Sequence, residues 1–132
     1  MLEKPILSSG LNHAQLEAIK KEKGEPNWVH QLVDSDFVRG VLICQSPGSE
    51  TDNHCHDHDE WWTILEGEIH WDIEGREETV VAKAGDFVFV PALTFHHIRP
   101  AGDGPSIRLA VTFPGKGHLH ERPARRLEIV AT

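Results

Sequence analysis

Histidine and glutamate side chains cluster in one short stretch of the chain, GSETDNHCHDHDEWWTILEG at residues 48–67. His54 and His56 are two positions apart, so on an extended chain their side chains leave the same face. Glu60 has the same parity if the chain stays extended, and it also converges on the histidines if a tight turn intervenes. Two imidazoles and one carboxylate that face one cavity make a three-point site for a divalent metal ion.

The segment from Gly85 to His96 (GDFVFVPALTFH) supplies His96 as a candidate for a fourth ligand. Iron(II), manganese(II), nickel(II) and zinc(II) all accept a donor set of histidine nitrogens and a carboxylate oxygen. We therefore expect one divalent transition metal ion and leave its identity open. His58 is an alternative ligand in place of His56 or Glu60, although we expect it in the turn or beside the ligands.

The composition limits the partners. The chain has 132 residues, enough for one domain, and carries 21 acidic and 13 basic side chains for a net charge of -8. Because phosphate binding requires a basic face, we expect no nucleic acid partner. No run of about 18 apolar residues predicts a membrane span, and the first residues lack the pattern of a signal peptide. Cys44 and Cys55 cannot form a disulfide framework, so we expect a reduced, cytoplasmic setting.

The order of elements predicts an all-β domain with a short N-terminal helix. Residues 1–27 are expected to form an arm and a helix over residues 12–23, capped by Asn12 and ended by Gly24. Residues 28–132 alternate between β-branched or apolar runs and turn-forming residues, which predicts a sandwich or barrel of short strands. The strands are expected at residues 28–33, 37–45, 60–67, 68–82 (a hairpin), 87–91, 95–100, 106–114 and 125–130.

At these positions the sequence resembles the cupins, in particular their small single-domain bacterial type. The first cupin motif, G-x5-H-x-H-x3/4-E-x6-G, is matched in every position and spacing by Gly48, His54, His56, Glu60 and Gly67. The second motif, G-x5-P-x-G-x2-H-x3-N, is matched by Gly85, Pro91 and His96. Leu93 stands in place of its second glycine, and Pro100 stands in place of its asparagine.

The resemblance implies an antiparallel jelly-roll β-barrel, or double-stranded β-helix, built of two sheets. It implies that His54, His56, Glu60 and His96 hold one divalent metal ion near the barrel centre, and that the protein is a homodimer. Such a ligand set leaves one or two positions of an octahedron open for water, dioxygen or substrate.

Several residues near the ligands are expected to shape a pocket. Trp62 shares the parity of Glu60, so we expect it to face the cavity while the preceding tryptophan faces away. Leu93 and Phe95 are close to His96 along the chain, and we expect them to wall the pocket.

Other residues are assigned from the usual burial of their types. Phe87 and Phe89 are expected in the core. Arg108 would bind a carboxylate substrate if it faced inward, but a lone charge is usually solvated, so we expect it to face outward. His118 and His120 form a second H-x-H with no carboxylate at a motif spacing, and we expect them in a surface loop near the barrel mouth.

The metal site predicts a metal-dependent enzyme that acts on a small organic molecule, and the resemblance to cupins favours dioxygenase chemistry, an oxidoreductase class, ahead of isomerase or decarboxylase chemistry. Glu60 is then a ligand alone or also a proton carrier. The alternatives are a non-catalytic barrel that binds or senses a small ligand, and a structural barrel with an adventitious metal. The chain has no tyrosine, which disfavours the cupin epimerases and lyases whose mechanism depends on one.

Overall fold

One short helix and eight strands make up the described part of the chain. The computed structural model describes residues 12–49, 51–113 and 119–121. The elements are α1 (Leu16–Lys23), β1 (Trp28–Asp34), β2 (Arg39–Gln45), β3 (Glu60–Glu66), β4 (Glu68–Ile73), β5 (Val80–Lys83), β6 (Phe87–Val90), β7 (His96–Ala101) and β8 (Ser106–Thr112). The strands expected between residues 28 and 114 are therefore confirmed, whereas the strand expected at 125–130 lies outside the described residues.

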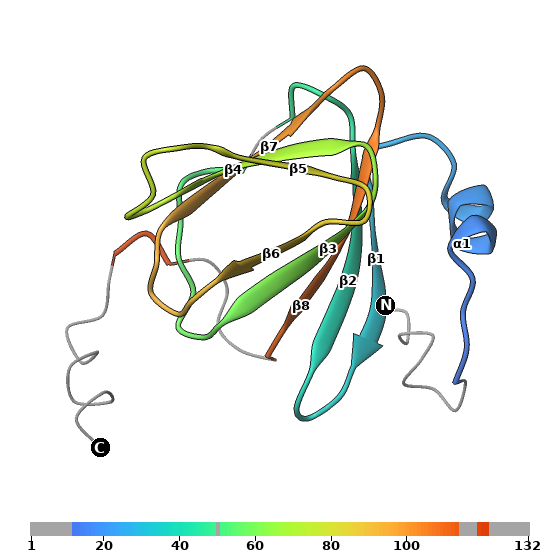
Figure 1. The fold of residues 1–132 in the computed structure, drawn as a ribbon. Helices are drawn as coiled ribbons and strands as arrows, with labels where there is room; N and C mark the ends of the chain where they lie inside the picture. The colour runs from blue at the N-terminus through green and yellow to red at the C-terminus, as the bar shows by residue number, and fades with distance from the viewer. Residues whose placement is uncertain (1–11, 50, 114–118, 122–132) are drawn as a thin grey trace.

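The strands form two antiparallel sheets that face one another (Figure 1). One sheet has five strands in the order β1-β2-β8-β3-β6, and the other has three in the order β5-β4-β7. Strands far apart along the chain lie side by side, as β8 does between β2 and β3. This topology is the predicted antiparallel jelly roll. No helix in the described part is long and apolar enough to cross a membrane.

The main core lies between the two sheets. Successive strand residues point to opposite faces, and the inward residues Trp62 and Ile64 of β3 meet Ile69 and Trp71 of β4. The rings of Trp62 and Trp71 have centroids 5.3 Å apart. Each of these side chains is at most 1% exposed, and burial of one large apolar side chain contributes about 1.5–3 kcal/mol. This cluster therefore holds the sheets together.

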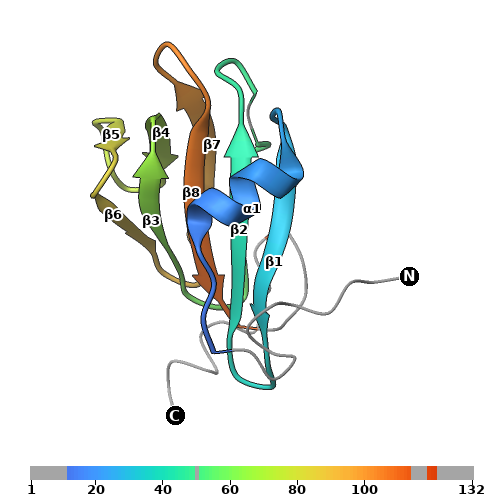
Figure 2. The ribbon, with the colours of Figure 1, turned by 90° about the vertical axis from the view of Figure 1, so that its right-hand side faces the viewer.

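Helix α1 lies on the outer face of the five-stranded sheet, across β1 and β2 (Figure 2). Its one fully buried residue, Ile19, packs with Leu42 and Cys44 of β2 and with Ile107 of β8. The helix thus covers a second apolar cluster, so β2 and β8 are buried on both of their faces.

The start of the helix differs from the prediction, and its end agrees. The helix begins at Leu16 instead of Asn12, and its N-cap residue, Gln15, makes no side-chain cap hydrogen bond. Packing of the apolar face therefore determines where the helix starts, because short helices gain most of their stability from tertiary contacts. At the other end Gly24 has φ +80, and its N–H donates to the carbonyl of Lys20 at 2.9 Å.

The prediction that Phe87 and Phe89 lie in the core is wrong. Burial alternates along β6, and the two phenylalanines are 73% and 56% exposed while Val88 and Val90 face inward. Since all four residues are apolar, their hydrophobicity does not show which pair faces the core. The pairing with β3 decides it, because Val88 lies opposite the inward-facing Trp62.

Two glycines in neighbouring turns have similar backbone angles and different surroundings. Gly67, between β3 and β4, has φ +80, and a Cβ there would lie 2.7 Å from the carbonyl oxygen of Pro105 and 2.8 Å from Cα of Ser106. Gly75, between β4 and β5, has φ +87, and a Cβ there would meet open space. The last glycine of the first motif is therefore required by close packing of backbone as well as by conformation.

We expect Gly67→Ala to lower the free energy of unfolding by about 3 kcal/mol or more, because backbone strain and steric overlap add. Gly75→Ala, the matched control, brings only the strain and costs about 1 kcal/mol. Urea unfolding of the two variants measures the difference. Equal losses would show that the contact with Pro105 and Ser106 does not restrict this turn.

Candidate metal centre

A pair of backbone hydrogen bonds brings the two sequence motifs together. The N–H of His54 donates to the carbonyl of His96 at 3.1 Å, and the N–H of His96 donates to the carbonyl of His54 at 2.8 Å. His54 belongs to the segment before β3, and His96 is the first residue of β7. This isolated bridge therefore places histidines from distant parts of the chain directly opposite each other.

Three of the four predicted ligands form one buried group. One ring nitrogen from each of His54, His56 and His96 lies within 4.8 Å of the others. The side chains are 2%, 8% and 1% exposed, and the ring centroids of His54 and His96 are 4.5 Å apart. Three imidazoles at this separation suit a transition metal ion, whose nitrogen ligands converge from about 2 Å.

Hydrogen bonds to backbone carbonyls orient two of the imidazoles. His96 Nδ1 lies 3.1 Å from the carbonyl oxygen of Thr94, and His54 Nδ1 lies 2.9 Å from that of Asp52. A carbonyl only accepts, so in each ring Nδ1 carries a proton, and in the neutral ring Nε2 then keeps a lone pair. Nε2 of His96 is buried and has no hydrogen-bond partner in the described part. This is the second-sphere arrangement that prepares a histidine for a metal.

Glu60, the first residue of β3, borders the histidine group. Its Oε1 lies 3.0 Å from Nε2 of His56 and 3.8 Å from Nε2 of His96. This buried oxygen makes no hydrogen bond to the described residues. A buried carboxylate oxygen without a hydrogen bond is costly unless a cation compensates it. The donor set therefore fits a divalent metal ion.

Burial lowers the pKa of His96 to about 4, and nearby His54 and His56 also lower it. The hydrogen bond to the Thr94 carbonyl and the charge of Glu60 act in the opposite direction. His96 is therefore neutral near pH 7, which is the form that binds a metal.

A cavity of about 220 Å³ adjoins this group. Trp62, predicted to face inward, is among the residues that line it, and its ring lies 5.5 Å from that of His96. The complete lining is Ile43, Gln45, Thr51, His54, His56, Glu60, Trp62, Ile98 and Arg108. The candidate site thus has polar and apolar walls beside the side chains that could hold a metal ion.

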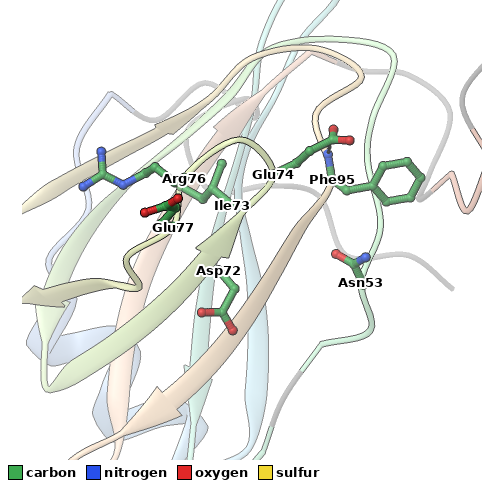
Figure 3. A pocket seen from close by; sticks show the side chains of 7 residues that line it. All are labelled: Asn53, Asp72, Ile73, Glu74, Arg76, Glu77 and Phe95. Carbon is green, nitrogen blue, oxygen red and sulfur yellow. Dashed lines mark hydrogen bonds between the residues drawn. The ribbon is translucent and has the colours of Figure 1, made fainter.

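Leu93 and Phe95, expected to wall the pocket, are not among the residues that line this cavity. Phe95 lies in a separate pocket beside the β4–β5 turn, together with Asn53 and Glu74 (Figure 3). Its backbone is held there, because the N–H of Glu74 donates to the Phe95 carbonyl at 2.9 Å. Closeness to His96 along the chain therefore did not predict closeness to the cavity.

Leu93 is buried and contacts the site through its backbone. Its φ is +60, in the region that favours glycine, and its N–H donates to the carbonyl of His56 at 2.7 Å. The second motif thus keeps the backbone conformation of its glycine although leucine occupies the position.

The prediction that Arg108 faces outward is wrong. Its side chain is 2% exposed and lines the same cavity as His54, His56 and Glu60. It lies in the central strand β8, whose outer face is covered by α1 through Ile107. Because both faces are buried, the usual link between charge and the solvent face fails here. Ala110 faces the main core, and Arg108 has the same parity along the strand. This shared parity was the sequence signal that Arg108 faces inward.

The remaining histidines lie around the group. His58 stacks on His56 with ring centroids 5.2 Å apart, and its Nδ1 lies 2.8 Å from Oδ1 of Asp57. His120 pairs with Asp52, whose other carboxylate oxygen lies 3.2 Å from Nδ1 of His54. The sequence did not suggest this link between His120 and His54 through Asp52. His118 lies outside the described residues.

The comparison with known families agrees with this geometry. The family model described as Cupin domain matches residues 41–113, more than half of the chain. The chain belongs to the cupin family. A search of curated proteins finds no match.

Solved structures support the cupin fold. A protein from Bacillus halodurans has a TM-score of 0.66 at 17% identity, over 86% of this chain and 90% of its own. An RmlC-like cupin from Methanocaldococcus jannaschii has a TM-score of 0.62 at 22% identity, over 69% and 83%. KdgF from Halomonas sp. has a TM-score of 0.60 at 19% identity, over 67% and 78%. At these identities the likeness establishes the fold alone.

The lowered pKa of His96 predicts a pH effect on the metal-free cupin. Between pH 6.5 and about 4, His96 is protonated in the unfolded chain and neutral in the folded chain. The free energy of unfolding therefore falls as the pH falls through this window. The loss amounts to roughly 3 kcal/mol. In His96→Gln, the free energy of unfolding should decline by roughly 3 kcal/mol less than in the wild type between pH 7 and pH 4. Urea unfolding over this pH range measures it. Parallel profiles for the two proteins would contradict it.

Proposed function

We propose that this cupin is a metal-dependent enzyme that acts on a small organic molecule, with dioxygenase-type oxidoreductase chemistry as the leading class. The supporting observation is that three buried histidines form one group, and that two of them, His54 and His56, line a cavity of about 220 Å³ together with Glu60. A closed structural metal site would need no such space beside the ligands. Isomerase and decarboxylase chemistry are the next classes.

In this proposal His54, His56, Glu60 and His96 hold the ion. Iron, manganese, nickel and zinc each suit this donor set. When bound, the ion supplies Lewis-acid or redox chemistry to a molecule in the cavity. The protein contributes orientation, because the carbonyls of Asp52 and Thr94 fix the rings of His54 and His96.

Glu60 and the apolar wall have separate roles. Glu60 brings a negative charge that offsets part of the charge of the ion, and its Oε1, 3.0 Å from Nε2 of His56, is also placed to hold a proton. Ile43, Trp62 and Ile98 form an apolar wall that excludes water from the reacting groups.

Metal analysis tests the ligand assignment. We expect one ion per chain in the wild type, and an affinity at least about 100-fold lower in His54→Ala and His96→Ala, because even second-sphere changes cost about 10–100-fold. His97→Ala, next to His96 in sequence but partly exposed on β7, is the matched control and should keep the metal. Full metal content in both ligand variants would show that the assignment is wrong.

Turnover assays test the enzymatic part. Protein loaded with iron(II) or manganese(II) is assayed for oxygen uptake and product formation with a panel of small organic molecules. Product formation that is lost in His54→Ala supports the proposal. Tight binding of a molecule without any product would instead favour a cupin that binds or senses its ligand.

We also propose a homodimer, supported by exposed aromatic residues on the outer face of the five-stranded sheet. Phe37, Trp61, Phe89 and Phe113 are between 41% and 81% exposed and line one groove of about 300 Å³. Clustered aromatic side chains on a surface mark protein interfaces. In a twofold dimer this patch would meet its own copy.

Phe89→Asp should weaken such a dimer by at least about tenfold, because loss of a central aromatic contact typically costs 2 kcal/mol or more. Val81→Asp replaces a comparably exposed apolar residue on β5, in the other sheet, and should leave the dimer unchanged. Sedimentation velocity over a range of concentrations measures both. A monomeric wild type would exclude the dimer.

A further inference from the structure

Arg108 is a buried cation in the wall of the candidate metal cavity. It occupies the middle of β8, paired with Ile43 of β2 on one side and with Ile64 of β3 on the other. The side chain is 2% exposed. A charge in this position is expensive to bury and needs a compensating partner.

The described residues satisfy Arg108 only in part. Its Nη1 donates to Oε1 of Gln45 at 2.7 Å, and its Nε has no hydrogen-bond partner. None of the described carboxylates forms an ion pair with it within 4.0 Å. A guanidinium has five N–H donors, so most of its donors remain available. Burial lowers its pKa to about 10, while Glu60 raises it, and the group stays charged near pH 7.

The charges around the cavity predict the charge of its ligand. Among the lining residues, Glu60 and Arg108 carry one negative and one positive charge, and the histidines bind a metal in their neutral form. A divalent ion would therefore leave the buried site with an excess of positive charge. An anionic ligand would neutralise this excess, whereas a neutral ligand would not.

We propose that the substrate is a small organic carboxylate whose carboxylate group pairs with Arg108. The planar guanidinium offers parallel N–H groups that match a carboxylate, and the cavity of about 220 Å³ limits the ligand to a small molecule. The apolar side chains Ile43, Trp62 and Ile98 then contact the rest of it. This inference rests on the proposed metal-dependent function and specifies its substrate class.

The experiment compares carboxylates with isosteric amides on zinc-loaded protein. Propionate and butyrate are titrated beside propionamide and butyramide at constant ionic strength, by calorimetry or by NMR shifts, and zinc content is measured on every sample. We expect the wild type to bind each carboxylate at least about tenfold more tightly than its amide, the ratio typical of one charge-assisted hydrogen bond. This comparison needs no variant.

Arg108→Met then distinguishes the contribution of Arg108 to carboxylate binding from that of the metal ion. Methionine keeps much of the side-chain volume without the charge, so zinc content should stay unchanged while carboxylate affinity falls at least about tenfold. Arg108→Gln carries the same expectation if the methionine variant does not fold. Arg39→Met, at the start of β2 and outside the cavity lining, is the control and should bind as the wild type does.

The outcomes separate the two proposals. A wild type that binds zinc but shows no preference for carboxylates overturns this inference alone, and so does an Arg108 variant that binds carboxylates as tightly as the wild type. A wild type that binds no zinc overturns the proposed function. Loss of carboxylate affinity with zinc retained supports both.

Discussion

The reciprocal backbone hydrogen bonds between His54 and His96 are the constraint on which the candidate site depends. They are one isolated bridge, outside the ladders of the two sheets, yet they place histidines from two distant segments face to face. Leu93 adds a second tie, since its N–H donates to the carbonyl of His56. Backbone groups make these ties, so they do not use the imidazole nitrogens that are the candidate ligands. Trp62 connects the main core to the candidate site, because its ring contacts both Trp71 and His96.

The fold could be predicted well because strands and turns have local signals. Seven expected ranges, one of them a hairpin of two strands, have outer ends within about two residues of those of the eight observed strands. Two motifs with fixed spacing indicated the jelly roll. The helix start was harder to predict, because Ile19 packing, and not Asn12 capping, determines it. Likewise, the sequence VFV within β6 allows either face to be buried, and only pairing with β3 shows that Val88 lies inside.

The site was predictable where spacing alone decides and was not where tertiary packing decides. His54, His56 and His96 come together as their motif positions imply, and Trp62 faces the cavity as its parity implies. Leu93 and Phe95 were assigned by sequence distance, which does not measure spatial distance across a loop. Arg108 was misplaced because a charged residue was expected on the solvent face. That expectation fails for β8, since α1 has turned the outer face of this strand into a second apolar interior.

Arg108 and Glu60 present the same energetic problem with opposite charges. Glu60 and Arg108 are both buried, both have polar atoms without hydrogen-bond partners, and they are not paired directly with each other within 4.0 Å. A fold selected only for stability would replace such groups with apolar residues, which is often neutral or stabilising. The same arrangement is useful in a binding site, because a divalent cation beside Glu60 and an anion beside Arg108 would together satisfy groups that the described residues leave unsatisfied. The cost of burying the two charges is then recovered when both ligands bind, which couples their affinities.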